Sequence, residues 1–333
     1  MLAGVIRYAW DEPVATFVAS GLALAGLAWV VGVGTESVGS RFGPAVTGVL
    51  QSTLGNLPEL FIVLFALSAG ELVVAQTSIL GSLFANALLV LGLAIVAGAT
   101  VSDDGLMRFH RRLPNDTATL LLLAVFIITL LGISNDVGDR ASGHQVTISA
   151  IGAVLLLSVY AVWLWSYVRS PREAVPDERE PALPFRTALV VLAFAGVAAA
   201  LVSDWFVHAL DPAVKALGIS KAFTGIVIVG IAGNAVENVV GISLAAKRQS
   251  DLAISVIKNS VAQIAVFLFP ALVLISLAFE THLTFVLGSV AIGALVLTAI
   301  SVWQITGDGE AMAFEGWALV AFYATIAVIA WYE

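Results

Sequence analysis

The sequence predicts an all-α polytopic membrane protein of ten transmembrane helices, arranged as two inverted five-helix repeats. Two features of composition predict the class: of the 333 residues, 60% are hydrophobic and only 11% are charged, and the mean hydropathy is +1.01. These values lie far outside the range of soluble globular domains. A third feature, one polar stretch that divides ten apolar stretches into five and five, predicts the arrangement.

Ten apolar stretches are long enough to cross a membrane, because a hydrocarbon layer about 30 Å thick requires about 20 residues of helix. The first ten residues contain one basic residue, Arg7, and lack the pattern of a cleavable signal peptide, so we expect the first span to be retained. The ten stretches lie near residues 14–34, 43–69, 72–98, 117–134, 146–168, 186–207, 221–246, 252–278, 282–304 and 311–332.

The distribution of positive charge predicts the orientation. Residues 170–185 are rich in proline and charge, as solvated linkers are, and they separate a first repeat at 1–169 from a second at 186–333. Of the 15 Lys and Arg residues, ten lie on the side of this linker, four lie on the side of the termini, and Lys258 lies within a predicted span. Because cytoplasmic loops carry the positive excess, we expect a cell-membrane protein with a cytoplasmic linker and both termini outside. Because five is odd, equivalent spans of the two repeats then run in opposite directions, as in many secondary transporters.

One polar motif, Gly-Asn-x-x-Glu, occurs twice within these apolar stretches, at residues 55–59 and 233–237. A carboxylate in hydrocarbon costs about 2.5 kcal/mol or more unless it is protonated, paired or bound to a cation, so it indicates a functional site. An offset of 23 residues leads from each glutamate to a serine, Ser82 in the first repeat and Ser260 in the second. The duplicated spacing predicts one site built from both repeats.

Each motif is followed by a span with polar side chains along one face. In each span, three of these side chains recur at every fourth residue and therefore share a helical face. They are Ser78, Ser82 and Asn86 in the third span, and Ser255, Asn259 and Gln263 in the eighth. The polar residues are Gln76, Ser78, Ser82 and Asn86 in the third span, and Ser255, Asn259, Ser260 and Gln263 in the eighth.

Oxygen groups of these kinds suit a hard cation. Ca2+ takes about 6–8 oxygen ligands from carboxylates, carbonyls, hydroxyls and water. Gly55 and Pro58 break the second span and free backbone carbonyls, which are further ligands. The seventh span has Val236 in place of the proline, so we expect a milder break there. The predicted side-chain ligands are Glu59, Glu237, Asn56, Asn234, Ser82 and Ser260.

Close helix packing is the competing interpretation for the neutral residues. Glycine, serine and asparagine also occur where membrane helices pack closely or hydrogen-bond across an interface. Packing explains Glu59 and Glu237 poorly, because it requires no ionisable group.

Two blocks of the sequence resemble a known family. Residues 55–60 and 73–86 are similar to the first alpha repeat of the calcium/cation antiporter superfamily, and are closest to its Ca2+/H+ exchanger (CAX-type) branch. Residues 233–237, 251–254 and 263–265 are similar to the second alpha repeat.

The resemblance implies alpha repeats over about residues 43–98 and 221–278. It implies that Glu59 and Glu237 bind the transported Ca2+, supported by the asparagine and serine of each repeat. Gln76 and Gln263 match family glutamines near the ion path. The further residues expected along this path are Gly55, Gly233, Ser78 and Asn259.

The coupling ion stays open between H+ and Na+. Sodium-coupled relatives carry acidic residues in the helix after the motif, whereas the corresponding stripes here are neutral and favour H+. The pair Pro58-Glu59, in contrast, resembles the sodium-coupled pattern in one repeat.

Lys258 departs from the family pattern, since its first-repeat counterpart is Leu80. Two accounts stand. In one, the side chain snorkels to the cytoplasmic face, because Asp251 at the start of the helix is only about 10 Å away at about 1.5 Å per residue. In the other, the ammonium is an internal counter-charge that pairs with Glu237 or Glu59.

The expected function is secondary active antiport of Ca2+ for H+ by alternating access around a midplane two-glutamate site. Na+-coupled exchange of Ca2+ or another cation is the alternative, and a non-transporting sensor or a channel is the alternative of a different class. We expect no enzyme and no cofactor, because the sequence lacks His-Glu-x-x-His and all four histidines fall at span ends or in loops. No basic, aromatic-interleaved segment suggests a nucleic-acid partner. The lipid bilayer is the expected environment.

Overall fold

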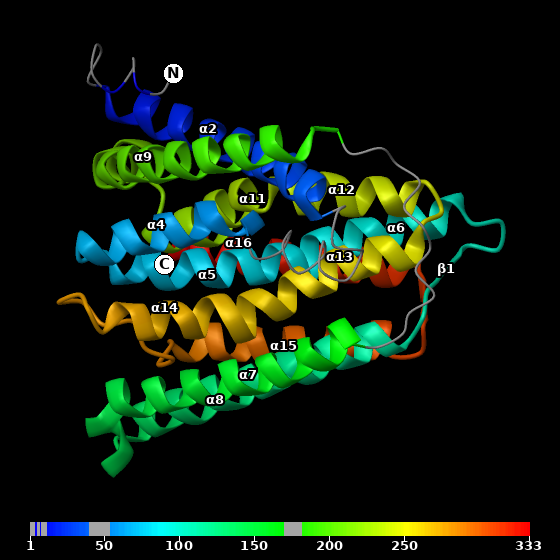
Figure 1. Cartoon of the computed structure of the whole chain (residues 1–333). Coiled ribbons are helices and arrows are strands. Elements are labelled where there is room, and N and C mark those ends of the chain that lie inside the picture. The colour runs from blue at the N-terminus through cyan, green and yellow to red at the C-terminus, as the bar shows by residue number, and fades with distance from the viewer. Residues whose placement is uncertain (1–3, 5–6, 8–11, 40–53, 170–181) are drawn as a thin grey trace.

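The computed structural model describes residues 4, 7, 12–39, 54–169 and 182–333, and these residues are almost entirely helical. The side chains of a few residues within helices, Glu237 among them, lie outside this described part. The start of the first long helix and the end of the last lie at one end of the bundle, and the strand β1 lies at the opposite end (Figure 1).

In the first half, the span formed by α5 and α6 includes a π-helical turn. The elements of this half are α2 (Pro13–Gly39), α4 (Leu57–Ser68), α5 (Leu72–Phe84), the π turn η2 (Ala85–Val90), α6 (Leu91–Val101), β1 (Leu106–Arg108), α7 (Arg112–Val137), the short 3-10 helix η3 (Arg140–His144) and α8 (Gln145–Arg169).

The second half contains a π turn in two of its spans. Its elements are α9 (Phe185–Leu217), α10 (Lys221–Phe223), η4 (Thr224–Val229), α11 (Gly230–Gly233), α12 (Ala235–Ala246), α13 (Ser250–Gln263), η5 (Ile264–Leu268), α14 (Phe269–Ser276), α15 (Ser289–Thr306), β2 (Glu310–Met312) and α16 (Ala313–Tyr332).

The predicted class, an α-helical polytopic membrane protein, is confirmed. Within the described ranges, eight helices are long and apolar enough to cross a membrane, and a ninth follows if Lys221–Gly233 and Asn238–Ala246, bent by 58°, form one span. The predicted second span, 43–69, begins in residues outside the described part, and its described portion is the 12-residue helix α4. The number ten therefore stays a prediction.

The predicted start of the ninth span at residue 282 is wrong, because α15 begins at Ser289. The preceding chain satisfies its backbone without a helix. The Ser276 hydroxyl accepts a hydrogen bond from the Leu283 N–H at 2.9 Å, and the Ser149 hydroxyl accepts one from the Phe285 N–H at 3.1 Å. Hydropathy alone does not detect such side-chain partners.

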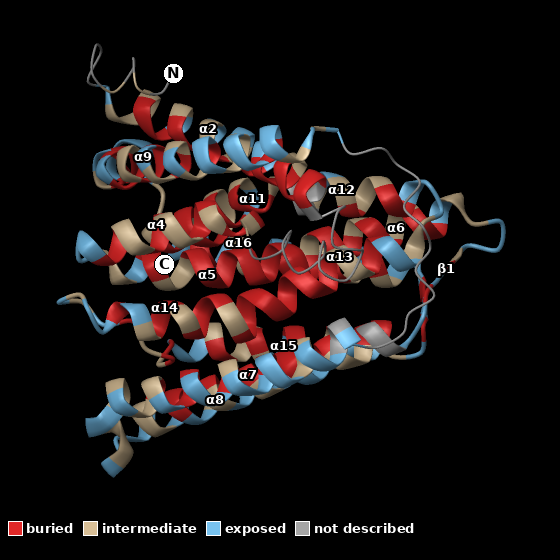
Figure 2. Ribbon diagram, in the orientation of Figure 1, coloured by how far each residue is buried: buried red, intermediate tan, exposed pale blue. Residues whose placement is uncertain are grey.

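The two spans that carry the polar stripes form the core. In the most apolar 18 residues of each span, 83% are buried within 72–101 and 78% within 250–276, against 22% within α9 and within α16. Figure 2 shows the same gradient, with buried residues concentrated in α5, α13 and α14 and exposed residues on the outer helices. Since the outer faces are apolar, they suit contact with lipid.

Neighbouring helices pair in a pattern that relates the halves. Helix α2 packs against α9, α4 against α5, and α12 against α13. Helix α6 packs against α16 and α12, whereas α14 packs against α8 and α4. At one end, β1 and β2 form an antiparallel pair with Leu106 opposite Met312, which ties the α6–α7 connection to the α15–α16 connection.

The backbones of the two halves touch where α5 crosses η4 and α11. A Cβ atom on Gly81 would lie 2.4 Å from the Gly225 carbonyl oxygen, and one on Gly230 would lie 2.5 Å from the Gly81 carbonyl carbon. Only glycine permits this approach, because such distances are too short for any side chain. The crossing sets the spacing between the segments of the two halves that carry the predicted ligands.

We expect Gly81→Leu to destabilise the protein by at least about 1–3 kcal/mol, the range for overpacking a filled interior. Thermal unfolding of the purified protein in detergent measures the effect. Gly26→Leu on α2 is the matched control, because a Cβ there has no atom within 4 Å. Equal unfolding temperatures for the two variants would contradict the assigned crossing.

Candidate cation-binding site

Glu59 is fully buried at the first turn of α4. The chain breaks at Asn56, and the new helix begins at Leu57 with Pro58 in its first turn, so the break predicted for this span is confirmed. A helix N-terminus carries free N–H groups and a partial positive charge that stabilise a carboxylate. The sequence thus places its acidic group at the favourable end of a helix that starts inside the bundle.

Both halves contact the Glu59 carboxylate. The Ser82 hydroxyl donates to Glu59 Oε1 at 3.5 Å. A Cβ on Gly233 would lie 2.4 Å from the same oxygen, so the backbone of the second motif lies directly against the carboxylate of the first. The predicted pairing across the 23-residue offset is therefore present in the first repeat.

The second motif also breaks its span, although it lacks a proline. The chain turns at Asn234 between α11 and α12. The Asn234 Nδ2 donates to the Gly230 carbonyl at 2.8 Å, which satisfies a backbone acceptor one turn before the break. The seventh span therefore breaks without a proline, and the Asn234 amide occupies a carbonyl near the break.

Asn86 joins the two repeats at the centre of the site. Its Nδ2 donates to Asn234 Oδ1 at 2.5 Å and to Ser260 Oγ at 3.1 Å. It is fully buried, and its own Oδ1 has no hydrogen-bond partner within the described part of the chain. The sequence placed Asn86 on the polar stripe but not among the predicted ligands. The signal that identifies it is its position one helical turn after Ser82.

Glu237 follows Asn234 in the first turn of α12, the position that Glu59 holds in α4. Its side chain lies outside the described part, so the place of the second carboxylate stays a prediction.

Of the remaining predicted residues, Gln76 bonds a residue outside the candidate site, and the others are buried. Gln76 Nε2 donates to the Val286 carbonyl at 3.1 Å, in the extended segment before α15. Ser78 Oγ and Gln263 Oε1 have no hydrogen-bond partner within the described part. Residues Gly55, Asn56, Ser78, Asn259 and Gln263 are all buried.

The two spans that carry Ser82 and Ser260 each widen into a π turn just after that serine. Turn η2 begins three residues after Ser82, and η5 begins four residues after Ser260. Such turns leave helical carbonyls without their usual partners and occur often at functional sites.

Lys258 is buried, with only 1% of its surface exposed, so the snorkelling account is wrong. Its Nζ donates to Thr306 Oγ1 at 3.3 Å, and this hydroxyl donates to the Val302 carbonyl at 2.6 Å. Thr306 is the last residue of α15, and a helix C-terminus stabilises a cation. The ammonium has no acidic partner among the described side chains. The Glu237 side chain is not one of these, so pairing with Glu237 stays a prediction.

Buried oxygen groups at two helix breaks, within a bundle whose outer faces are apolar, define a polytopic membrane transporter. The sodium/calcium exchanger protein family matches residues 12–168 and 187–332, and this chain belongs to that family.

Individual relatives match over nearly their whole length. The Ca2+/H+ antiporter ChaA of Bacillus subtilis is 32% identical over 91% of this chain and 88% of its own. The vacuolar calcium ion transporter of Schizosaccharomyces pombe is 31% identical over 98% of this chain and 81% of its own. The structure of native YfkE superposes with a TM-score of 0.85 at 27% identity, covering all of this chain and 97% of that one.

We expect Asn86→Leu to abolish the stabilisation of the protein by added CaCl2. The variant leaves Asn234 and Ser260 without their shared donor, and a buried polar group left unsatisfied costs about 1–3 kcal/mol. The calcium-dependent shift in unfolding temperature measures the loss. Asn135→Leu at the end of α7 is the control, and an unchanged shift in Asn86→Leu would exclude this residue from the site.

We expect Lys258→Met to unfold at the same temperature as the wild type or a higher one. A buried ammonium without an anionic partner is costly, and methionine has a similar shape. Lys258→Ala should unfold earlier, because it leaves a cavity. A large destabilisation by both variants would instead reveal a paired charge, since breaking a buried ion pair costs about 3–5 kcal/mol.

Proposed function

We propose that this protein exchanges Ca2+ for H+ across a membrane by alternating access around a site that contains Glu59 and Glu237. The observation that carries the proposal is the buried Glu59 carboxylate, held between Ser82 of its own half and Gly233 of the other. The relative ChaA is named a Ca2+/H+ antiporter, which supports the same pair of ions.

The proposed architecture is ten spans in two inverted repeats. Helix packing supports it, because contacts occur in equivalent pairs: α4 with α5 and α12 with α13, then α6 with α16 and α14 with α8. Helices α6 with α12 and α14 with α4 form a third pair. The start of α2 and the end of α16 at one end of the bundle agree with an even number of spans.

Charge neutrality couples the two ions in this proposal. Hydrocarbon penalises an empty ionised carboxylate, whereas a protonated one and a Ca2+-bound one both cost less. Two carboxylates close together also resist double ionisation and bind protons more readily than in water. The loaded and protonated states therefore reorient, and the empty charged state does not.

The neutral side chains supply the remaining coordination. Asn234, Ser260 and Ser82 each offer an oxygen, and Asn86 orients two of them through its amide N–H groups. Because the described polar groups around Glu59 are uncharged, the proposal takes H+ rather than Na+ as the coupling ion. It includes no chemical catalysis and no resident cofactor.

The proposed location is the cell membrane, with the linker cytoplasmic and both termini outside. The excess of Lys and Arg on the side of the linker supports this orientation. The fission yeast relative is named a vacuolar transporter, so the membrane itself is tested by locating a tagged protein in its own cell.

Glu59→Gln should abolish Ca2+ uptake driven by an acid interior in proteoliposomes, because the amide can neither release a proton nor balance Ca2+. A calcium-sensitive dye in the lumen reports the flux. Glu315→Gln, whose carboxylate caps the start of α16, is the control and should transport normally.

The same vesicles separate the alternatives. Uptake that follows only an imposed Na+ gradient would overturn H+ coupling, and uptake without any counter-ion gradient would indicate a channel. Normal uptake by Glu59→Gln would overturn the site.

A further inference from the structure

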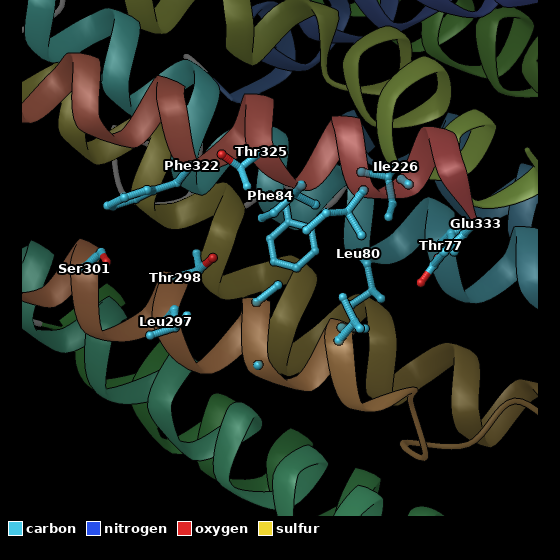
Figure 3. Close-up of a pocket in the computed structure, with 17 residues that line it drawn as sticks. Thr77, Leu80, Phe84, Ile226, Leu297, Thr298, Ser301, Phe322, Thr325 and Glu333 are labelled. Carbon is cyan, nitrogen blue, oxygen red and sulfur yellow. The ribbon is translucent and has the colours of Figure 1, made fainter. Parts of the chain in front are cut away.

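A membrane-facing cavity of about 470 Å3 lies behind the candidate site. Figure 3 shows it between α15 and α16, with Leu80 and Phe84 of α5 on its floor. The opposite face of α5 carries Ser82, and the floor also includes Ile226 of η4. The cavity thus touches the two segments whose glycine crossing spaces the site.

The cavity opens toward the bilayer. At its rim, Val290 and Leu297 on α15 are 56% and 65% exposed, and Phe322 and Ile329 on α16 are 45% and 43% exposed. Large apolar side chains exposed on membrane-spanning helices face lipid, so the medium at this opening is hydrocarbon.

The walls are mostly apolar, and two of their hydroxyls are satisfied within their own helices. Thr77 Oγ1 donates to the Val73 carbonyl at 2.7 Å, and Thr325 Oγ1 donates to the Ala321 carbonyl at 2.9 Å. Because both hydroxyls bond within their own helices, neither requires a partner from the cavity. Water would find few hydrogen bonds here, and an empty cavity of this size would forfeit van der Waals contacts.

The length of the cavity matches one leaflet. Val290 and Ser301 mark its extent on α15 and are 11 residues apart, which is about 16 Å of helix. Phe322 and Glu333 mark a similar extent along α16, with Glu333 at one end (Figure 3). Half of the hydrocarbon core is about 15 Å thick. The cavity therefore runs from a polar end at the membrane surface to the middle of the bilayer.

We propose that this cavity binds one acyl chain of a membrane phospholipid, inserted from the leaflet nearest Glu333. The chain fills the space between the outer helices α15 and α16 and the ligand-bearing helix α5. It packs against Ile226, whose carbonyl accepts a hydrogen bond from the Tyr323 hydroxyl of α16 at 3.3 Å, and this bond joins α16 to η4. The lipid is thus part of the support of the candidate site, and its binding does not depend on which ions are exchanged.

Photolabelling tests the proposal. The full-length protein is reconstituted in vesicles of phosphatidylethanolamine and phosphatidylcholine that contain a phosphatidylcholine with a mid-chain diazirine, irradiated and mapped by mass spectrometry. We expect label on Phe84 and Thr298, which are 1% and 3% exposed and which lipids around the outer surface do not reach. Absence of label on both Phe84 and Thr298 in the wild type would overturn the proposal.

A filled cavity provides the matched comparison. Gly293 lines the cavity, and a Cβ there has no atom within 4 Å, so Gly293→Phe projects into open space. We expect it to reduce floor labelling at least fivefold, whereas Gly196→Phe on α9, equally unobstructed, leaves it unchanged. Gly293→Leu supplies a smaller filler if the phenylalanine variant does not elute as a single species. Unchanged floor labelling in a folded filler variant, or crosslinks between two copies of the chain in place of lipid adducts, would overturn the proposal.

Discussion

The cost of a carboxylate in hydrocarbon governs this structure. Glu59 is fully buried, so it requires donors, a helix N-terminus and a neighbouring backbone within reach. A helix N-terminus at that depth requires a broken span, and a broken span exposes backbone groups that lipid cannot satisfy. The breaks at Asn56 and Asn234 therefore lie inside the bundle, and longer, unbroken helices such as α8 and α16 surround it. The cost of burying Glu59 thus explains why irregular backbone near it lies inside the bundle.

The second requirement is that the two halves approach closely enough to share one site. Gly81, Gly225 and Gly230 bring the backbones of α5, η4 and α11 into contact, and Gly233 brings the second motif against Glu59. Asn86 then bonds residues of the other half. Neither half holds these groups alone, so the site exists only when both halves have folded and packed.

Sequence reasoning predicted the class, the break at the first motif and the pairing of Glu59 with Ser82, because local patterns determine each of them. It did not predict the two bonds of Asn86, since a stripe identifies a face but not its partner. Lys258 shows the same limit. The Lys258 ammonium lies at the end of α15 because it bonds Thr306, which is 48 residues further along the chain. No local pattern relates these two residues. The late start of α15 likewise depends on hydroxyls of Ser149 and Ser276.

The two helices that carry the predicted ligands Ser82 and Ser260 have different support on the side away from the candidate site. Leu80 of α5 lies on the floor of an apolar cavity, whereas Lys258, its counterpart on α13, bonds Thr306 at the end of α15. In the proposed architecture of two inverted repeats, identical halves would give the inward-facing and outward-facing states equal energies. A buried ammonium on one helix and an apolar cavity on the other would remove this equality. Under that proposal, side chains that need not touch the transported ion set which state is populated in the absence of ions.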